Sequence, residues 1–180
     1  MKKLALALAA FAGAMMLFSC TSQDGKFLKE AEKMYSQAEK MVNQAEDMDS
    51  FFDALAQFQD QKNAFAQEMM AAYSEDGENA MVPDELIEAI SERANAYNEV
   101  EAQKFAELFT PYLEEWEAAA DKLLAAYDDP DTTDDEWDTL VAHYEDAFEN
   151  VMDFAEYDNV LPEIRERCEA VLNRMLPLTE

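Results

Sequence analysis

The chain has 180 residues, of which 41 are acidic, 13 are lysine or arginine and one is histidine, so its formal net charge at neutral pH is −28. Recognition of nucleic acid needs a basic surface, so this excess of carboxylates excludes nucleic acid as a partner. An apolar content of 49% indicates a folded domain with a core and excludes an acidic disordered tail.

The first residues have the features of a secretory signal. Lys2 and Lys3 precede an apolar run that ends near Phe18 and is too short for a comfortable membrane span. The run ends in Leu17-Phe18-Ser19-Cys20, which resembles the lipobox of bacterial lipoproteins, where the cysteine thiol receives a diacylglyceryl group. The resemblance extends only over this segment. It implies a signal peptide over 1–19, lipidation of Cys20 and a membrane as partner through that lipid.

The same resemblance implies a location. A lipidated protein of this kind is anchored in the bacterial cell envelope, and Thr21 stands where an aspartate often marks retention in the inner membrane. We therefore expect the outer membrane, with the leaflet left open. A short tether over 20–25 then leads into a single acidic domain over 26–180.

A near-repeat of seven residues predicts the first helix. Its apolar positions step by four and three along one face: Phe27, Ala31, Met34, Ala38, Met41, Ala45 and Met48. We expect this helix to end near Asp49 and Ser50. A second apolar series then runs over 51–73 with a polar layer at Gln61 and Lys62, and a turn follows at 75–79.

Three further segments complete the chain. A helix starts at Pro83, and Pro111 either kinks it or separates two helices with Thr110 as cap; the lack of loop-forming neighbours favours the kink. Thr133 and Glu136 form a predicted capping box for a helix that runs to about residue 155, and the last helix covers about 162–176. The sequence therefore predicts an all-α fold, an antiparallel bundle of five to six helices, with an elongated arrangement as the alternative.

Few residues have the type and spacing that catalysis or metal binding requires. His143 has Asp146 one turn on, but Leu140 occupies the position that a Glu-x-x-His metal pair needs. We therefore predict no catalytic residue, no cofactor and no specific metal site. Weak candidates for divalent cations lie in one acidic break: Asp128, Asp129, Asp131, Asp134 and Asp135.

The acidic break departs from the EF-hand pattern. Counted from Asp129, that pattern needs glycine at 134 and glutamate at 140, and the chain has Asp134 and Leu140. A solvated loop that caps the next helix is the favoured interpretation. Cys168 cannot pair with a lipidated Cys20, and we expect it to be a small buried apolar residue.

These features favour a non-enzymatic lipid-anchored envelope protein that acts through contacts with an unidentified protein, as scaffold or accessory subunit. The alternative is a protein that binds a small ligand or a divalent cation, with a pocket near Gln61 and Lys62 or at the acidic break. A holdase-type chaperone comes third. A cavity with convergent polar groups would favour the small-ligand alternative.

Overall fold

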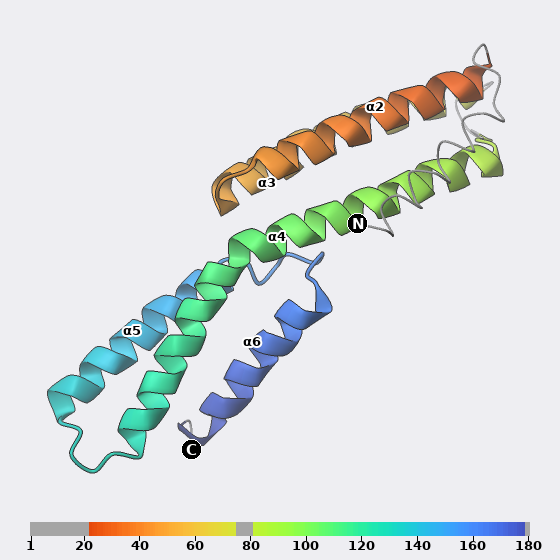
Figure 1. The fold of residues 1–180 in the computed structure, drawn as a ribbon. Helices are drawn as coiled ribbons and strands as arrows, with labels where there is room; N and C mark the ends of the chain where they lie inside the picture. The colour runs from red at the N-terminus through yellow and green to blue at the C-terminus, as the bar shows by residue number, and fades with distance from the viewer. Residues whose placement is uncertain (1–21, 75–80, 179–180) are drawn as a thin grey trace. The chain divides into compact units, whose positions relative to one another are not determined.

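A computed structural model of the chain describes residues 22–74 and 81–178 (Figure 1). Within these ranges the backbone forms helices and no strand, which confirms the predicted all-α bundle. The signal with its lipobox and the turn at 75–79 lie outside the described residues. The helices are α2 (Gln23–Gln44), α3 (Met48–Tyr73), α4 (Asp84–Tyr127), α5 (Asp134–Met152), α6 (Pro162–Met175) and the 3-10 helix η1 (Leu176–Leu178).

Side-chain caps determine where α2 and α3 begin. Ser22 Oγ accepts a hydrogen bond from the Gly25 backbone N–H at 3.1 Å, so α2 begins at Gln23 and takes in residues that we assigned to the tether. Asp47 and Ser50 form a reciprocal capping box at the start of α3. The predicted boundary near Asp49 and Ser50 is therefore wrong, because the Asp47 carboxylate starts the second helix ahead of it.

The later helix ends agree better with the sequence. Thr133 Oγ1 accepts from the Glu136 N–H at 3.3 Å and Glu136 Oε2 accepts from the Thr133 N–H at 3.0 Å, which confirms the predicted capping box. Pro162 lies in the first turn of α6, where proline needs no donor. By contrast, α5 ends at Met152, and the following residues form turns instead of continuing the predicted helix.

The helix α4 continues through Pro111. The alternative of two helices with Thr110 as cap is therefore wrong. Thr110 Oγ1 donates to the Ala106 carbonyl at 2.6 Å, within the helix. Proline removes one backbone donor from a helix, and a threonine hydroxyl bonded to the carbonyl four residues back often bends a helix.

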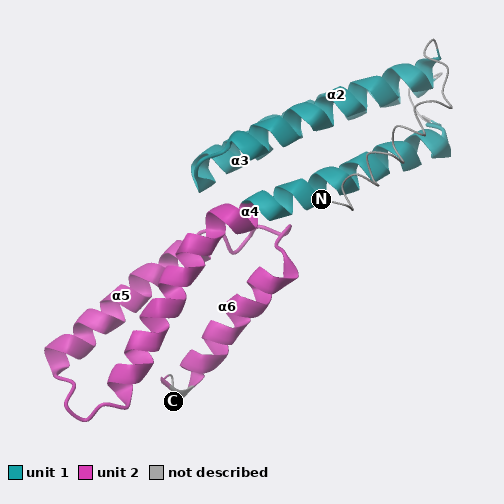
Figure 2. Ribbon diagram, viewed as in Figure 1, with its two compact units in different colours: residues 1–104 teal, residues 105–180 magenta. Residues whose placement is uncertain are grey.

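The chain divides into two compact units, residues 1–104 and 105–180 (Figure 2). Unit 1 contains α2, α3 and the first part of α4, and unit 2 contains the rest of α4 with α5 and α6. Because both units share one helix, the single domain predicted over 26–180 stays a prediction.

Unit 1 has an aromatic core. Tyr35 of α2, Phe58 of α3 and Tyr97 of α4 meet with ring centroids 4.5 to 5.9 Å apart. The Tyr73 hydroxyl donates to the Asp24 carboxylate, so the start of α2 lies beside the end of α3 and the two helices are antiparallel. Burial, together with this hydrogen bond, raises the pKa of Tyr73 to about 12.

A buried arginine joins α4 to α2. Arg93 is only 3% exposed, and its guanidinium pairs with Glu32 at 3.1 Å and with Glu39 at 2.8 Å. The same group lies 5.4 Å from the centre of the Tyr35 ring. Since both carboxylates lie on one face of α2, two turns apart, Arg93 specifies the register of the two helices.

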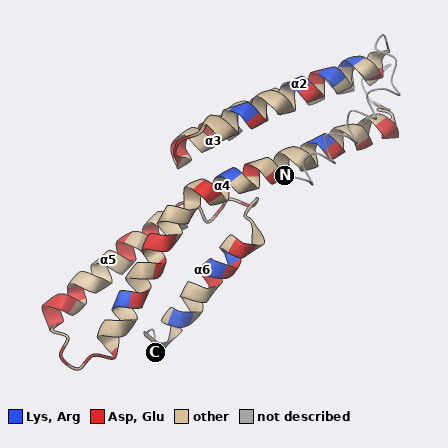
Figure 3. Cartoon of the chain, in the orientation of Figure 1, with Lys and Arg blue, Asp and Glu red and all other residues tan. Residues whose placement is uncertain are grey.

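In unit 2, two arginines of α6 form ion pairs with carboxylates of α4. Arg167 of α6 donates two hydrogen bonds to the Glu117 carboxylate, at 2.9 and 2.7 Å, and this pairing lowers the pKa of Glu117. Arg174 pairs with Asp121 one helical turn further along. On the other side, Trp116 of α4 packs on Phe148 of α5 with ring centroids 5.6 Å apart. Figure 3 shows Asp and Glu outnumbering Lys and Arg along α4 and α5.

None of the described helices has both the length and the apolar character that a membrane crossing requires.

We predict that Arg93→Ala lowers the free energy of unfolding by about 3 kcal/mol, because it removes one partner of a buried charge network. Urea unfolding followed by circular dichroism measures the change. Arg174→Ala is the matched control, since its ion pair is exposed and worth about 0–1 kcal/mol. Equal effects of the two substitutions would contradict the role given to Arg93.

Candidate functional site

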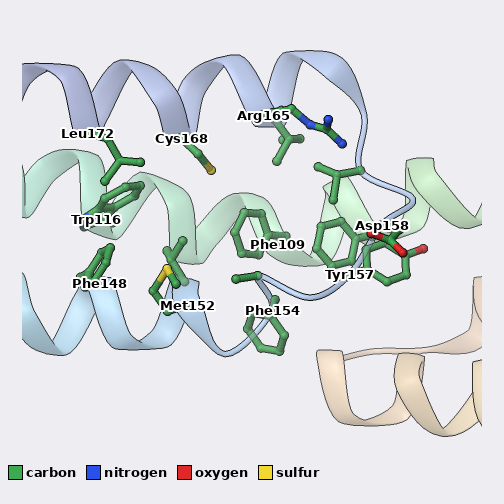
Figure 4. A pocket seen from close by; sticks show the side chains of 15 residues that line it. Phe109, Trp116, Phe148, Met152, Phe154, Tyr157, Asp158, Arg165, Cys168 and Leu172 are labelled. Carbon is green, nitrogen blue, oxygen red and sulfur yellow. The ribbon is translucent and has the colours of Figure 1, made fainter.

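Unit 2 contains an apolar pocket of about 490 Å³ between its three helices (Figure 4). This volume lies within the range of small-molecule sites, roughly 300–1,000 Å³. Its walls come from every helix of the unit: Phe109 and Trp116 of α4, Phe148 and Met152 of α5, and Cys168 and Leu172 of α6.

The turns after α5 line one end of the pocket. Phe154 packs edge-on against Phe109 with centroids 6.0 Å apart, and Tyr157 stacks on Phe105 at 4.3 Å. Because α5 ends at Met152, these rings leave the helical register and turn toward α4. The sequence predicted a longer helix here and so missed the pocket.

One wall of the pocket carries a buried donor without an acceptor. Trp116 is 1% exposed, and its Nε1–H has no hydrogen-bond partner among the described residues. An unsatisfied buried donor costs about 1–3 kcal/mol. A water molecule or an oxygen atom of a ligand would relieve that cost.

Two opposite charges line the same pocket. Arg165 of α6 and Asp158, in the segment before α6, are both exposed. Figure 4 shows them at one end of the pocket, with Trp116 and Phe148 at the other. The pocket therefore has a polar end and an apolar end, which suits a ligand with the same division.

Cys168 is a free cysteine on the pocket wall. It is half-buried, so the prediction of a buried apolar residue is only partly correct. Burial raises the pKa of its thiol, and the nearby Arg167 guanidinium offsets this only in part. A raised pKa lowers the thiolate fraction at neutral pH and makes the thiol a poor nucleophile.

The acidic break forms a more open hollow. Asp129, Asp131 and Asp135 line it, but Asp129 Oδ1 already accepts from the Asp131 backbone N–H at 2.9 Å. Across the described residues, no group of three acidic, histidine or cysteine side chains is arranged to hold a metal ion, and this includes His143. The weak candidates are therefore not brought together: Asp128, Asp129, Asp131, Asp134 and Asp135.

A further hollow lies where the sequence placed a pocket. Lys62 and Glu101 line a space of about 450 Å³ in unit 1, next to the Phe58 and Tyr97 rings. The Lys62 ammonium lies 5.6 Å from the Phe58 ring centre. Gln61 does not line this space. The space beside Lys62 has a smaller apolar surface than the unit 2 pocket. The unit 2 pocket is therefore the stronger candidate for a ligand site.

No family model, curated protein or solved structure matches this chain significantly.

We predict that Cys168 reacts slowly with a thiol reagent and that its reactivity rises at higher pH than that of free cysteine. Burial raises the pKa of the thiol, so the reactive thiolate forms only at higher pH. The rate of reaction with a disulfide reagent between pH 7 and 10, in the chain from 21 to 180, measures it. The same chain unfolded in urea serves as control and should return to ordinary behaviour. A folded-state midpoint at or below the unfolded one would contradict the assignment.

Proposed function

We propose that this protein is a non-enzymatic, lipid-anchored binding protein of a bacterial cell envelope and that its unit 2 pocket holds a small apolar ligand. The observation that carries the proposal is the pocket itself, with aromatic walls and polar groups at one end. Among the functions expected from the sequence, this moves the small-ligand alternative ahead of the scaffold.

The chemistry of the walls favours binding over catalysis. Cys168 is the thiol on the pocket surface, and its raised pKa opposes nucleophilic attack. The remaining wall is mainly aromatic and aliphatic, which favours burial of apolar ligand surface. The free energy of such binding comes from the apolar area removed from water.

The proposed anchor is a lipid on Cys20, on the basis of the lipobox resemblance. The described helices begin at Gln23, so a lipid on Cys20 would hold unit 1 close to the membrane surface. The outer membrane is the proposed location. A protein anchored in this way binds its ligand at the membrane surface, where the ligand enters or leaves the bilayer.

The scaffold function is the second candidate. Four large apolar side chains of the described part of unit 2 are exposed: Tyr127 by 59%, Met152 by 49%, Leu172 by 48% and Leu176 by 59%. Exposed apolar groups close together are typical of surfaces that contact proteins. Met152 and Leu172 also line the pocket, so an occupied pocket would change this surface.

We predict that the chain from 21 to 180 binds the dye N-phenyl-1-naphthylamine saturably, with one dye per chain and a rise in dye fluorescence. Cys168→Phe fills the middle of the pocket and should weaken binding by about tenfold or more, the equivalent of about 1.4 kcal/mol. Ala170→Phe, an exposed position on the same helix outside the pocket lining, is the matched control and should leave binding unchanged. Equal effects of both substitutions, or no saturable binding, would sink the proposal.

We also predict that Cys20→Ala blocks lipid attachment. The variant should lose the mass of the lipid and leave an unprocessed or soluble product in fractionated cells. Mass spectrometry of the purified protein together with membrane fractionation gives the readout. Normal processing and membrane association of Cys20→Ala would overturn the lipoprotein proposal.

A further inference from the structure

We propose that the ligand of the unit 2 pocket is a single-chain amphiphile with a zwitterionic head group, whose anionic group contacts Arg165 and whose cationic group contacts Asp158. This inference rests on the pocket function proposed above. It adds the chemical class of the ligand and the residues that select it.

Arg165 differs from the other arginines of the chain. Arg93, Arg167 and Arg174 each pair with carboxylates of a neighbouring helix. The Arg165 guanidinium makes no ion pair within the described residues, and neither does the Asp158 carboxylate. Two opposite charges at one end of a pocket, neither neutralised by the protein, are suited to opposite charges on a ligand.

The surroundings of Asp158 suit a cationic group. Tyr157 lies beside it in Figure 4, and the Tyr157 ring stacks on Phe105. The faces of aromatic rings attract quaternary and primary ammonium groups, and a carboxylate beside the ring adds a charge of opposite sign. The ammonium of the head group therefore belongs at the Tyr157 and Asp158 side, and its phosphate or carboxylate at Arg165.

The charge of the whole chain selects for a neutral ligand. A net charge of −28 repels an anion from the pocket mouth. A cation would bind diffusely to carboxylates over the entire surface and would leave Arg165 unused. A zwitterion avoids the long-range repulsion and engages both local charges.

The rest of the pocket suits one hydrocarbon chain. From the charged end, the lining runs past Phe109 and Cys168 to Trp116 and Phe148 (Figure 4). The lining residues follow α4 from Phe109 to Trp116, and a pocket of about 490 Å³ has room for a single hydrocarbon chain. The head group then lies at the end where Arg165 and Asp158 are exposed to solvent.

Isothermal titration of the chain from 21 to 180 with three twelve-carbon probes, each below its critical micelle concentration, tests the inference. The probes are dodecylphosphocholine, dodecanoate and dodecyltrimethylammonium. We expect dodecylphosphocholine to bind one per chain and about tenfold tighter than the other two, as one extra charge-assisted contact provides.

Substitutions assign the two charges. Arg165→Gln should weaken dodecylphosphocholine about tenfold and leave dodecyltrimethylammonium unchanged, whereas Asp158→Asn should weaken dodecylphosphocholine and leave dodecanoate unchanged. Arg174→Gln removes the same charge from the same helix outside the pocket lining and should change nothing. Equal affinities for all three probes would overturn the head-group inference while the pocket function stands. Failure of all three to bind would overturn both.

Discussion

Arginine–carboxylate pairs on α4 are the interaction on which both units depend. The chain has 28 more acidic than basic residues, and carboxylates of α2 and α4 are placed where arginines of α4 and α6 form ion pairs across helices. Arg93 joins α4 to α2 in unit 1, and Arg167 and Arg174 join α6 to α4 in unit 2. Each guanidinium serves as an attractive contact between the acidic α4 and a helix whose own charges balance, while apolar side chains supply most of the burial energy.

The three arginines differ in environment, and their ion pairs therefore differ in energy. Arg93 is almost completely buried, with its glutamates 27 and 28% exposed, so the pair lies in a medium that screens poorly. Arg174 and Asp121 are 42 and 63% exposed, and water and salt screen their attraction. The consequence is that unit 1 depends on a charge for its helix register, whereas unit 2 depends more on aromatic packing around Trp116.

Periodicity predicted the helices because apolar residues at helical spacing have few other ways to be buried together. The Thr133 and Glu136 capping box was predicted for the same local reason, since its hydrogen bonds involve only neighbouring residues. The start of α3 was missed because serine, in place of the usual glutamate or glutamine, completes the box and Met48 prolongs the preceding apolar stripe.

Arg93 and the pocket were not predictable by the same reasoning. A charged residue is expected at the surface unless its partners on another helix are known. The two partners of Arg93 reach it only when the helices pack together. The pocket arises where side chains from three helices fail to fill the space between them, and each of those residues alone resembles core. Arg165 and Asp158 looked like ordinary surface charges, and only the three-dimensional structure places them at one pocket end.

If Cys20 carries a lipid and the pocket holds an amphiphile, as proposed, the protein combines a lipid anchor with a lipid-like ligand in its second unit. The ligand would cover apolar walls and neutralise the two charges that the fold leaves unpaired. The acidic surface of the protein would repel anionic head groups. A neutral ligand would meet no such repulsion.

The indole N–H resonances of the two tryptophans test the central claim most directly. Trp116 lines the pocket with an unpartnered N–H, whereas Trp137 packs on Tyr127 outside the pocket lining and is the internal control. Titration with dodecylphosphocholine below its critical micelle concentration, followed by two-dimensional NMR, should move the Trp116 resonance saturably and leave that of Trp137 in place. An unmoved Trp116 resonance, or equal movement of both, would contradict a ligand pocket in unit 2.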